Sequence, residues 1–199
     1  TVTNSGVYDQ DGDIVVTGAF LQDDAATGTN ELGAALTAAG IEFDGASTLT
    51  AATVNMNSGG NALTFDGTLA GGTNALNLTA GAGDISFNDT VSGMGTTTVA
   101  SAANVTAVST FGGADYVQTT GTGETDFQGA VTLSGNLDFN GAYLTISAAG
   151  NTVGGDMTVT NSGLYDQDGD IVVTGACLQD GAGGNALGAD LTAAGIEFD

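Results

Sequence analysis

The chain has 199 residues and a formal net charge of −23, because it contains 23 Asp and Glu residues and no Lys, Arg or His; it also has no Pro and no Trp. Without cations it cannot neutralise the phosphates of a nucleic acid or the surface of an anionic membrane. Without His or Lys it lacks a Ser-His-Asp triad, an imidazole metal ligand and a Schiff-base lysine. We therefore expect no nucleic-acid partner, and no membrane insertion in this segment, because no run approaches the 18 apolar residues of a membrane span.

The first element of the chain, Thr1–Asp23, contains the acidic sequence DQDGD. Calcium takes several hard oxygen ligands, and alternating carboxylates around a Gly turn can converge on one ion. An EF-hand is excluded, because Ile14 and Phe20 occupy the positions where that loop needs Gly and Glu. Two interpretations stay open, a calcium site and a solvated Asp-Gly corner. The candidate ligands, in this copy and in a second copy near the end of the chain, are Asp9, Asp11, Asp13, Asp166, Asp168 and Asp170.

The next elements are marked by phenylalanines at a constant interval. Phe43, Phe65 and Phe87 are each 22 residues apart, and other apolar residues between them keep the same offset. This pattern predicts that the three rings lie above one another inside the molecule, about 4.8 Å apart. Beyond Phe87 the interval loosens, and Val108 and Phe127 are the expected members of the following layers of this core stack.

Between these positions apolar and polar residues alternate over four to six residues, which is typical of short, half-buried strands. The 34 glycines supply corners between the strands. We therefore predict an all-β fold, a parallel β-solenoid of about 20–22 residues per coil with two or three strands in each. The alternative is an array of β-sandwich modules, which has short strands and turns but predicts no constant 22-residue offset.

The end of the chain repeats its beginning. TVTNSGVYDQDGDIVVTGAFLQD at 1–23 returns at 158–180 with two substitutions, and Leu36–Asp44 returns unchanged at Leu191–Asp199. Residues 1–44 and 158–199 are thus copies of the same part of a repeat of 155 to 157 residues. We expect one continuous solenoid segment over 1–199, cut as a window from a longer array.

Smaller signals each have two interpretations. Asn77, Asn88 and Asn104 fit the N-glycosylation pattern, although chance matches are expected in a chain rich in Asn and Thr. Cys177 is the only cysteine and stands where the first copy has Phe20. It is expected to face the core as a small apolar residue, with an intermolecular disulfide as the alternative.

The segments NALTFDGTLAGGTNALNLTAGAGDISFNDTVSG (61–93) and GAVTLSGNLDFNGAYLTISAAGNTV (129–153) are Gly/Asn/Thr-rich with alternating strands. In this style the chain resembles the repetitive regions of large bacterial surface exoproteins of the filamentous-haemagglutinin and autotransporter-adhesin class. The resemblance implies secretion, a right-handed parallel β-helix, and a role in adhesion or extracellular scaffolding. It implies no catalytic residues.

Together these observations predict a structural segment of an extracellular or cell-surface fibre. Its expected partners are copies of itself, added end to end, and divalent cations such as calcium, which would neutralise a shaft carrying about one negative charge per 2 Å. The alternative function is an adhesin stalk or a carbohydrate-binding surface module. An enzyme is not expected; the one activity that the side chains allow is a glycosidase with two carboxylates.

Overall fold

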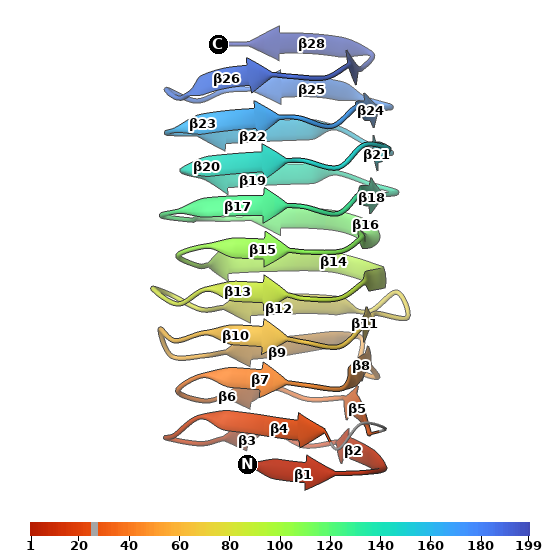
Figure 1. The fold of residues 1–199 in the computed structure, drawn as a ribbon, viewed down its shortest axis with the longest axis vertical. Helices are drawn as coiled ribbons and strands as arrows, with labels where there is room; N and C mark the ends of the chain where they lie inside the picture. Colours follow the sequence, from red (N-terminus) through yellow and green to blue (C-terminus); the bar gives the residue numbers. More distant parts are fainter. Residues whose placement is uncertain (25–27) are drawn as a thin grey trace.

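The computed structural model describes residues 1–24 and 28–199, and in this part of the chain the strands pair in parallel and no helix is present. The strands form ten coils that stack into a column (Figure 1). This confirms the predicted parallel β-solenoid. The β-sandwich alternative is wrong, because the pairing connects each strand to its counterpart in the next coil.

The column has three faces, and each coil contributes to all of them. One face is a ten-stranded sheet, with one strand from each coil, which we call the first face. Its strands are β1 (Val2–Asn4), β4 (Phe20–Asp24), β7 (Ile41–Phe43), β10 (Leu63–Phe65), β13 (Ile85–Phe87), β15 (Val105–Ala107), β17 (Glu124–Phe127), β20 (Tyr143–Ile146), β23 (Leu164–Gln167) and β26 (Gly184–Leu187).

The other two faces belong to one 18-stranded sheet, because β14 (Val91–Ser101) and β16 (Phe111–Gln118) run across the corner between them. The second face also contains β2 (Val7–Gln10), β5 (Thr29–Leu32), β8 (Ala46–Leu49), β11 (Leu69–Ala70), β18 (Val131–Leu133), β21 (Asn151–Val153), β24 (Ile171–Val173) and β27 (Leu191–Thr192). The third face also contains β3 (Ile14–Val15), β6 (Leu36–Thr37), β9 (Thr53–Asn57), β12 (Ala75–Thr79), β19 (Leu137–Gly141), β22 (Met157–Asn161), β25 (Ala176–Gln179) and β28 (Gly195–Phe198).

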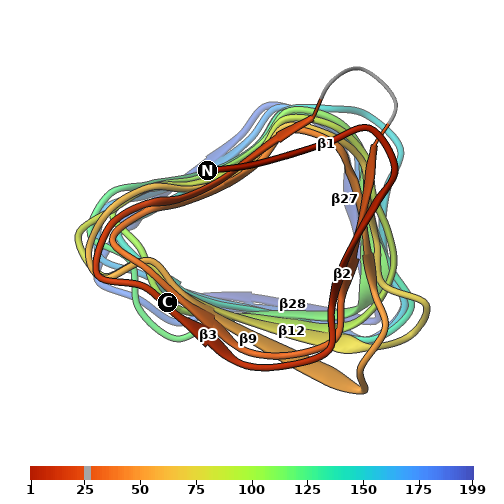
Figure 2. The same cartoon turned by 90° about the horizontal axis from the view of Figure 1, so that it is seen from below.

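Seen along the column, the coils superpose as a rounded triangle (Figure 2). From the N terminus, which is nearest the viewer in this view, the chain runs clockwise while it recedes, so the solenoid is right-handed (Figures 1 and 2). The register between neighbouring coils varies from 17 residues, as between Leu32 and Leu49, to 22 residues, as between Phe43 and Phe65. Coils can differ in length because the additional residues are accommodated at the corners.

The core is a narrow apolar column, and the predicted phenylalanine stack lies in it. Phe43, Phe65 and Phe87 pair in register on the first face. Their ring centroids are 5.5 and 5.6 Å apart, and the rings are within 11° of parallel. Phe127 is also buried in this column, as predicted.

Val108 was predicted in this stack, and that prediction is wrong. Phe87 pairs with Ala107, so Ala107 faces inward and Val108, as the next residue, faces outward with 45% of its surface exposed. The coil is two residues shorter here than the 22-residue interval requires. Phe111, from the second face, fills the space above the small Ala107: its ring centroid is 5.5 Å from that of Phe87 and 5.6 Å from that of Phe127.

Candidate functional site

The acidic DQDGD segments lie at corners of the solenoid. Asp9 is on β2, and Asp11 and Asp13 follow it, all exposed. Within residues 1–24 and 28–199, a single group of acidic residues brings its carboxylate oxygens within 4.8 Å of one another, and it contains no residue of either DQDGD segment. The three aspartates of each segment therefore do not converge on one point. Calcium binding at these segments therefore stays a prediction.

Two of these carboxylates have a structural partner in the next coil. The Asp13 carboxylate accepts a hydrogen bond from the backbone N–H of Ala35 at 3.0 Å, and the Asp170 carboxylate accepts one from the N–H of Asp190 at 3.1 Å. Both residues immediately precede a strand, and the N–H that they bind precedes the neighbouring strand. The corner interpretation thus has a specific role: the carboxylate connects one coil to the next.

The same contact recurs as a ladder of acid and amide side chains before the third face. Asp115 accepts from the N–H of Asn136 at 2.8 Å, and Asn136 accepts from the N–H of Asp156 at 2.9 Å. Asp156 in turn accepts from the N–H of Ala176 at 2.8 Å. These hydrogen bonds satisfy backbone donors at corners, where the strand pairing is interrupted. Part of the negative charge of the chain therefore has a structural use.

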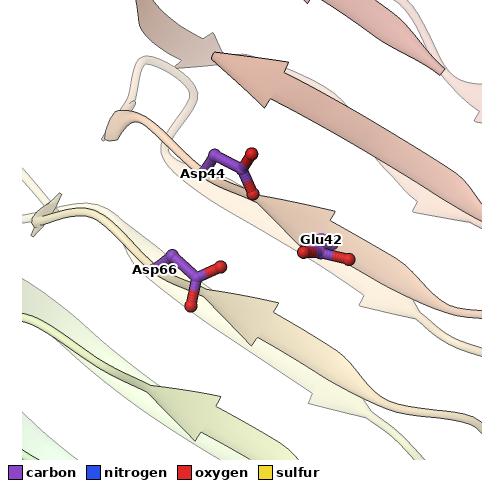
Figure 3. Close-up of side chains that lie close together, drawn as sticks. All are labelled: Glu42, Asp44 and Asp66. Carbon is purple, nitrogen blue, oxygen red and sulfur yellow. The ribbon is translucent and has the colours of Figure 1, made fainter. Parts of the chain in front are cut away.

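The carboxylates that do converge are those of Glu42, Asp44 and Asp66 (Figure 3): one oxygen atom of each lies within 4.8 Å of the corresponding oxygens of the other two. Glu42 is on β7, and Asp44 and Asp66 immediately follow β7 and β10. The register that stacks Phe43 on Phe65 also places Asp44 beside Asp66. Asp23 belongs to the same column one coil below and contributes, with Glu42 and Asp44, to a shallow depression on the first face.

This acidic cluster is electrostatically strained. Burial raises the pKa of the Glu42 carboxyl above its ordinary value, and the negative charges of Asp44, Asp66 and Asp23 raise it further. Three converging carboxylates are a donor set that suits a hard cation such as calcium. Sequence reasoning missed the cluster, although the signal was present: a 22-residue offset that stacks Phe43 and Phe65 must also bring the residues that follow them together.

The three glycosylation candidates lie in different environments. Asn88 is exposed and donates to the Asp66 carboxylate at 2.5 Å, while Asn77 lies within β12 and donates to Asn55 at 2.9 Å. Asn104 is engaged on both sides, because it donates to Asp84 at 2.8 Å and accepts from the N–H of Glu124 at 2.9 Å. N-glycosylation modifies the side-chain nitrogen, and in all three residues this nitrogen already donates a hydrogen bond to the preceding coil. Glycosylation at these positions stays a prediction.

Cys177 is buried on β25 in register with Met157 and Ile196, and burial raises the pKa of its thiol. A buried, protonated thiol is poorly placed for exchange with another chain. The position agrees with the expectation that it packs as a small apolar residue.

The end of the column formed by β26, β27 and β28 exposes residues of the core type. Ile196 and Phe198 pair with the buried Cys177 and Gln179 and therefore face inward, yet 49% and 38% of their surfaces are exposed. Leu187, in the same coil, is 46% exposed. We call these three side chains, with the free edges of β26, β27 and β28, the C-terminal end face.

Comparisons of the chain with models of protein families, with curated proteins and with solved structures gave no match. Within the described residues there is no helix that is long and apolar enough to cross a membrane.

Proposed function

We propose that the chain is a structural segment of an extracellular fibre, whose shaft lengthens by adding coil upon coil at the ends of the solenoid. One observation carries the proposal: Leu36–Asp44 and Leu191–Asp199 have the same sequence and different environments. Ile41 and Phe43 are 2% and 0% exposed, because a further coil covers them, while their counterparts Ile196 and Phe198 belong to the C-terminal end face. The same residues are therefore suited to burial under another coil.

Two physical terms favour association at the ends. The outermost strands present unpaired backbone N–H and C=O groups, which can pair with another strand. Burying the end-face side chains also removes apolar surface from water. Stacking repeats in a solenoid satisfies both terms at once, since each coil contacts only its neighbours.

The sides of the column, in contrast to its ends, oppose association. With 23 acidic residues and no Lys, Arg or His, two columns brought side to side repel each other at low ionic strength. Repulsion at the sides and apolar attraction at the ends together direct association along the axis. The absence of Lys and Arg also leaves trypsin-like proteases no cleavage site, which suits an extracellular location.

Calcium is part of this proposal as a stabilising ion. The convergent carboxylates of Glu42, Asp44 and Asp66 repel one another, and a divalent cation would relieve that repulsion. Cations shared between the DQDGD corners of neighbouring shafts would also allow lateral bundling that charge otherwise opposes. Calcium should therefore raise stability and promote bundles, and a chelator should reverse both effects.

The test of end-to-end growth uses matched substitutions. Purified chain at increasing concentration should form rods that lengthen without thickening in electron micrographs, and sedimentation should show the same growth. Ile196→Asp on the C-terminal end face should suppress growth, whereas Val108→Asp, a comparably exposed side chain on the flank of the column, should leave it unchanged. Failure of the unsubstituted chain to lengthen, or equal loss in both variants, would contradict the proposal.

A carbohydrate-contacting surface is the second candidate, and one feature favours it. A groove at the corner between the third and first faces is lined by hydroxyl and amide side chains with no charged group among them: Thr120, Asn140, Thr160 and Ser162. Neutral donors and acceptors of this kind match sugar hydroxyls. Binding of the chain to a panel of neutral polysaccharides, lost in Asn140→Ala, would support this function, and absence of binding across the panel would exclude it.

A further inference from the structure

The groove at the corner between the third and first faces has a volume of about 300 Å³ and a floor of backbone atoms. The residues along its floor, Gly121, Gly141 and Asn161, project no side chain outward. A Cβ added to Gly141 would lie 2.6 Å from the ring of the buried Phe139, and the Asn161 side chain is turned inward, where it accepts a hydrogen bond from Gln179 at 2.7 Å. The strands β19 and β22 beside the groove each have a coil on both sides, so this hollow is a feature of the column itself.

The polar side chains along the groove are available to a ligand. Within the described residues, Asn140 is the one asparagine whose side chain has no hydrogen-bond partner, whereas the others connect coils or stabilise corners. The hydroxyls of Thr120, Thr160 and Ser162 also have no partner in this part of the chain, and all four side chains are exposed. Asn140 and Thr160 pair in register, so they line the same wall of the groove. Free donors and acceptors around a hollow are the groups that orient a ligand.

The opposite rim of the groove carries an exposed aromatic ring. Tyr143 begins β20 on the first face and is 49% exposed, whereas Tyr116 and Tyr165 are fully buried. Its ring lies against the backbone of Gly163, because a Cβ added there would be 2.5 Å from the ring. Since Gly163 directly follows Ser162, the ring of Tyr143 lies beside the groove, with an apolar surface that no neighbouring coil covers.

The charges near the groove restrict what can bind there. No Asp or Glu lines it, but Glu124 is the register partner of Tyr143, and Asp180 directly precedes Gly181 at one end of the groove. In a chain of net charge −23 without Lys, Arg or His, a polyanionic ligand is repelled. An uncharged ligand with many hydroxyl groups is not subject to this repulsion and matches the free amide and hydroxyl groups.

The length of the groove matches a chain of sugar residues. The lining residues come from four successive coils, which at about 4.8 Å per coil correspond to about 14 Å along the axis. Sugar residues in an extended glycan repeat at nearly the spacing of the coils. Equivalent groups one coil apart, such as Asn140 and Thr160, can therefore meet successive sugars of one chain.

We infer that this groove binds an extended, uncharged glycan that lies along the solenoid axis, with one sugar residue per coil. The ring of Tyr143 stacks on the apolar face of one sugar, as tyrosine side chains do at surfaces that are partly apolar and partly wet. Asn140, Thr160 and Ser162 exchange hydrogen bonds with sugar hydroxyls. The inference rests on the second proposed function, the carbohydrate-contacting surface, and adds the class of glycan, its direction and its aromatic contact.

The experiment measures binding of the full chain to β-1,4-linked oligomers of glucose, N-acetylglucosamine and mannose by titration calorimetry, with galacturonic acid oligomers as the anionic comparison. For at least one neutral series, the affinity should rise with length up to about three or four sugars, which span the groove, and then level off. The galacturonic acid oligomers should bind at least about ten-fold more weakly than that series.

Matched variants locate the binding. Tyr143→Ala should weaken binding by at least about ten-fold and Tyr143→Phe, which keeps the ring, by less than about three-fold, while Asn140→Ala should weaken it by at least about five-fold. The controls are Val172→Ala and Thr152→Ala, two exposed side chains on the second face, and they should leave the affinity unchanged.

Tyrosine fluorescence supplies a measurement on the unsubstituted chain, which has no Trp. Bound glycan should reduce quenching by acrylamide, and Tyr143→Phe should abolish that reduction. Binding that the Tyr143 and Asn140 variants leave unchanged, or equal affinity for galacturonic acid oligomers, would overturn the inference and leave a carbohydrate-contacting function to another surface. Absence of binding in all three neutral series would remove both, whereas growth of rods tests the fibre independently.

Discussion

Residues 1–44 and 158–199 are nearly the same sequence in two positions of one column, and they differ in what lies above and below them. In the first copy Phe43 has Phe20 below and Phe65 above, with ring centroids 5.5 Å away on each side. In the second copy the corresponding Phe198 belongs to the last coil and is partly exposed. At the other end of the repeat the relation is reversed, because Tyr165 is buried among coils while its counterpart Tyr8 lies in the first coil and is half-buried.

This comparison teaches that burial in the solenoid is a property of neighbouring coils and is not encoded in the individual strand. The local pattern decides which side chains point inward. The adjacent coil then decides whether these side chains leave water. Substitutions at paired positions can therefore separate the two contributions, because sequence and local conformation are held constant.

The largest difference is expected for the phenylalanine pair. Phe43→Ala removes a fully buried ring that packs against rings on both sides and should lower the free energy of unfolding by about 3–5 kcal/mol. Phe198→Ala should cost less than about 1 kcal/mol, since much of its ring is in water. Urea unfolding of both variants measures the difference, and equal losses would contradict the dependence on neighbouring coils.

Gly12 and Gly169 are equivalent positions in the two copies, and they test how closely the preceding coil packs against each copy. A Cβ on Gly169 would lie 1.7 Å from the carbonyl oxygen of Ala148, whereas a Cβ on Gly12 would meet nothing within 4 Å. Gly169→Ala should therefore destabilise by about 3 kcal/mol or more, because the opposing atoms are backbone and cannot move aside cheaply. Gly12→Ala should change stability by less than about 0.5 kcal/mol in thermal unfolding. Similar losses would mean that the coils at Gly169 are not packed as closely as described.

The aspartate pair should show no difference, which sharpens the comparison. Asp13 and Asp170 each hold a backbone N–H of the following coil, so both have their neighbour in place. Asp13→Ala and Asp170→Ala should each cost about 1 kcal/mol, and the Asn variants, which retain an acceptor oxygen, should cost less. A loss confined to one copy would show that the contact depends on more than the coil above.

The smallest effect is expected at the glutamate pair. Because the pKa of Glu42 is raised, protonation favours the folded state, so its unfavourable contribution appears as the pH rises through that pKa and disappears at lower pH. Glu42→Gln should stabilise the chain at neutral pH by roughly 0.2–1 kcal/mol and weaken the response to calcium. Glu197→Gln, in the copy without a further coil, serves as the control in calcium titrations followed by thermal unfolding. An unchanged calcium response in Glu42→Gln would exclude the acidic cluster as the binding place.

Much of the fold follows from the sequence, because a solenoid converts sequence intervals directly into spatial neighbours. The 22-residue interval fixed Phe43, Phe65 and Phe87 correctly, and Phe127 as well. The prediction for Val108 is wrong because the coil from Phe87 to Ala107 is two residues shorter than the 22-residue interval. Val108 is therefore one residue beyond the inward-facing position, and along a strand a shift of one residue turns the side chain to the opposite side. The filling of that layer by Phe111, from another face, depends on three-dimensional shape and has no counterpart in the interval.

The candidate site was less predictable for a related reason. Within one DQDGD segment, alternation and the corner spread the carboxylates apart, and Asp13 turns to the next coil. The carboxylates of Asp44 and Asp66 meet because they are separated by one coil, so proximity here depends on the interval and not on the local motif. The two copies of the repeat also lie on different faces, since β7 is on the first face and β28, which has the same sequence, is on the third. This difference could not be read from the sequence, because it depends on the number of faces in a coil.

The most direct test of the stacked column is a series of distances along the first face. Glu42 is connected by successive strand pairs to Thr106, Thr145 and Asp166, which lie three, five and six coils away. Spin labels at Glu42 and at each of these positions, in chains carrying Cys177→Ala, allow the distances to be measured by pulsed electron resonance. The stacked coils predict about 14, 24 and 29 Å, a constant increase of about 4.8 Å per coil. Distances that do not increase with the number of coils would contradict the account.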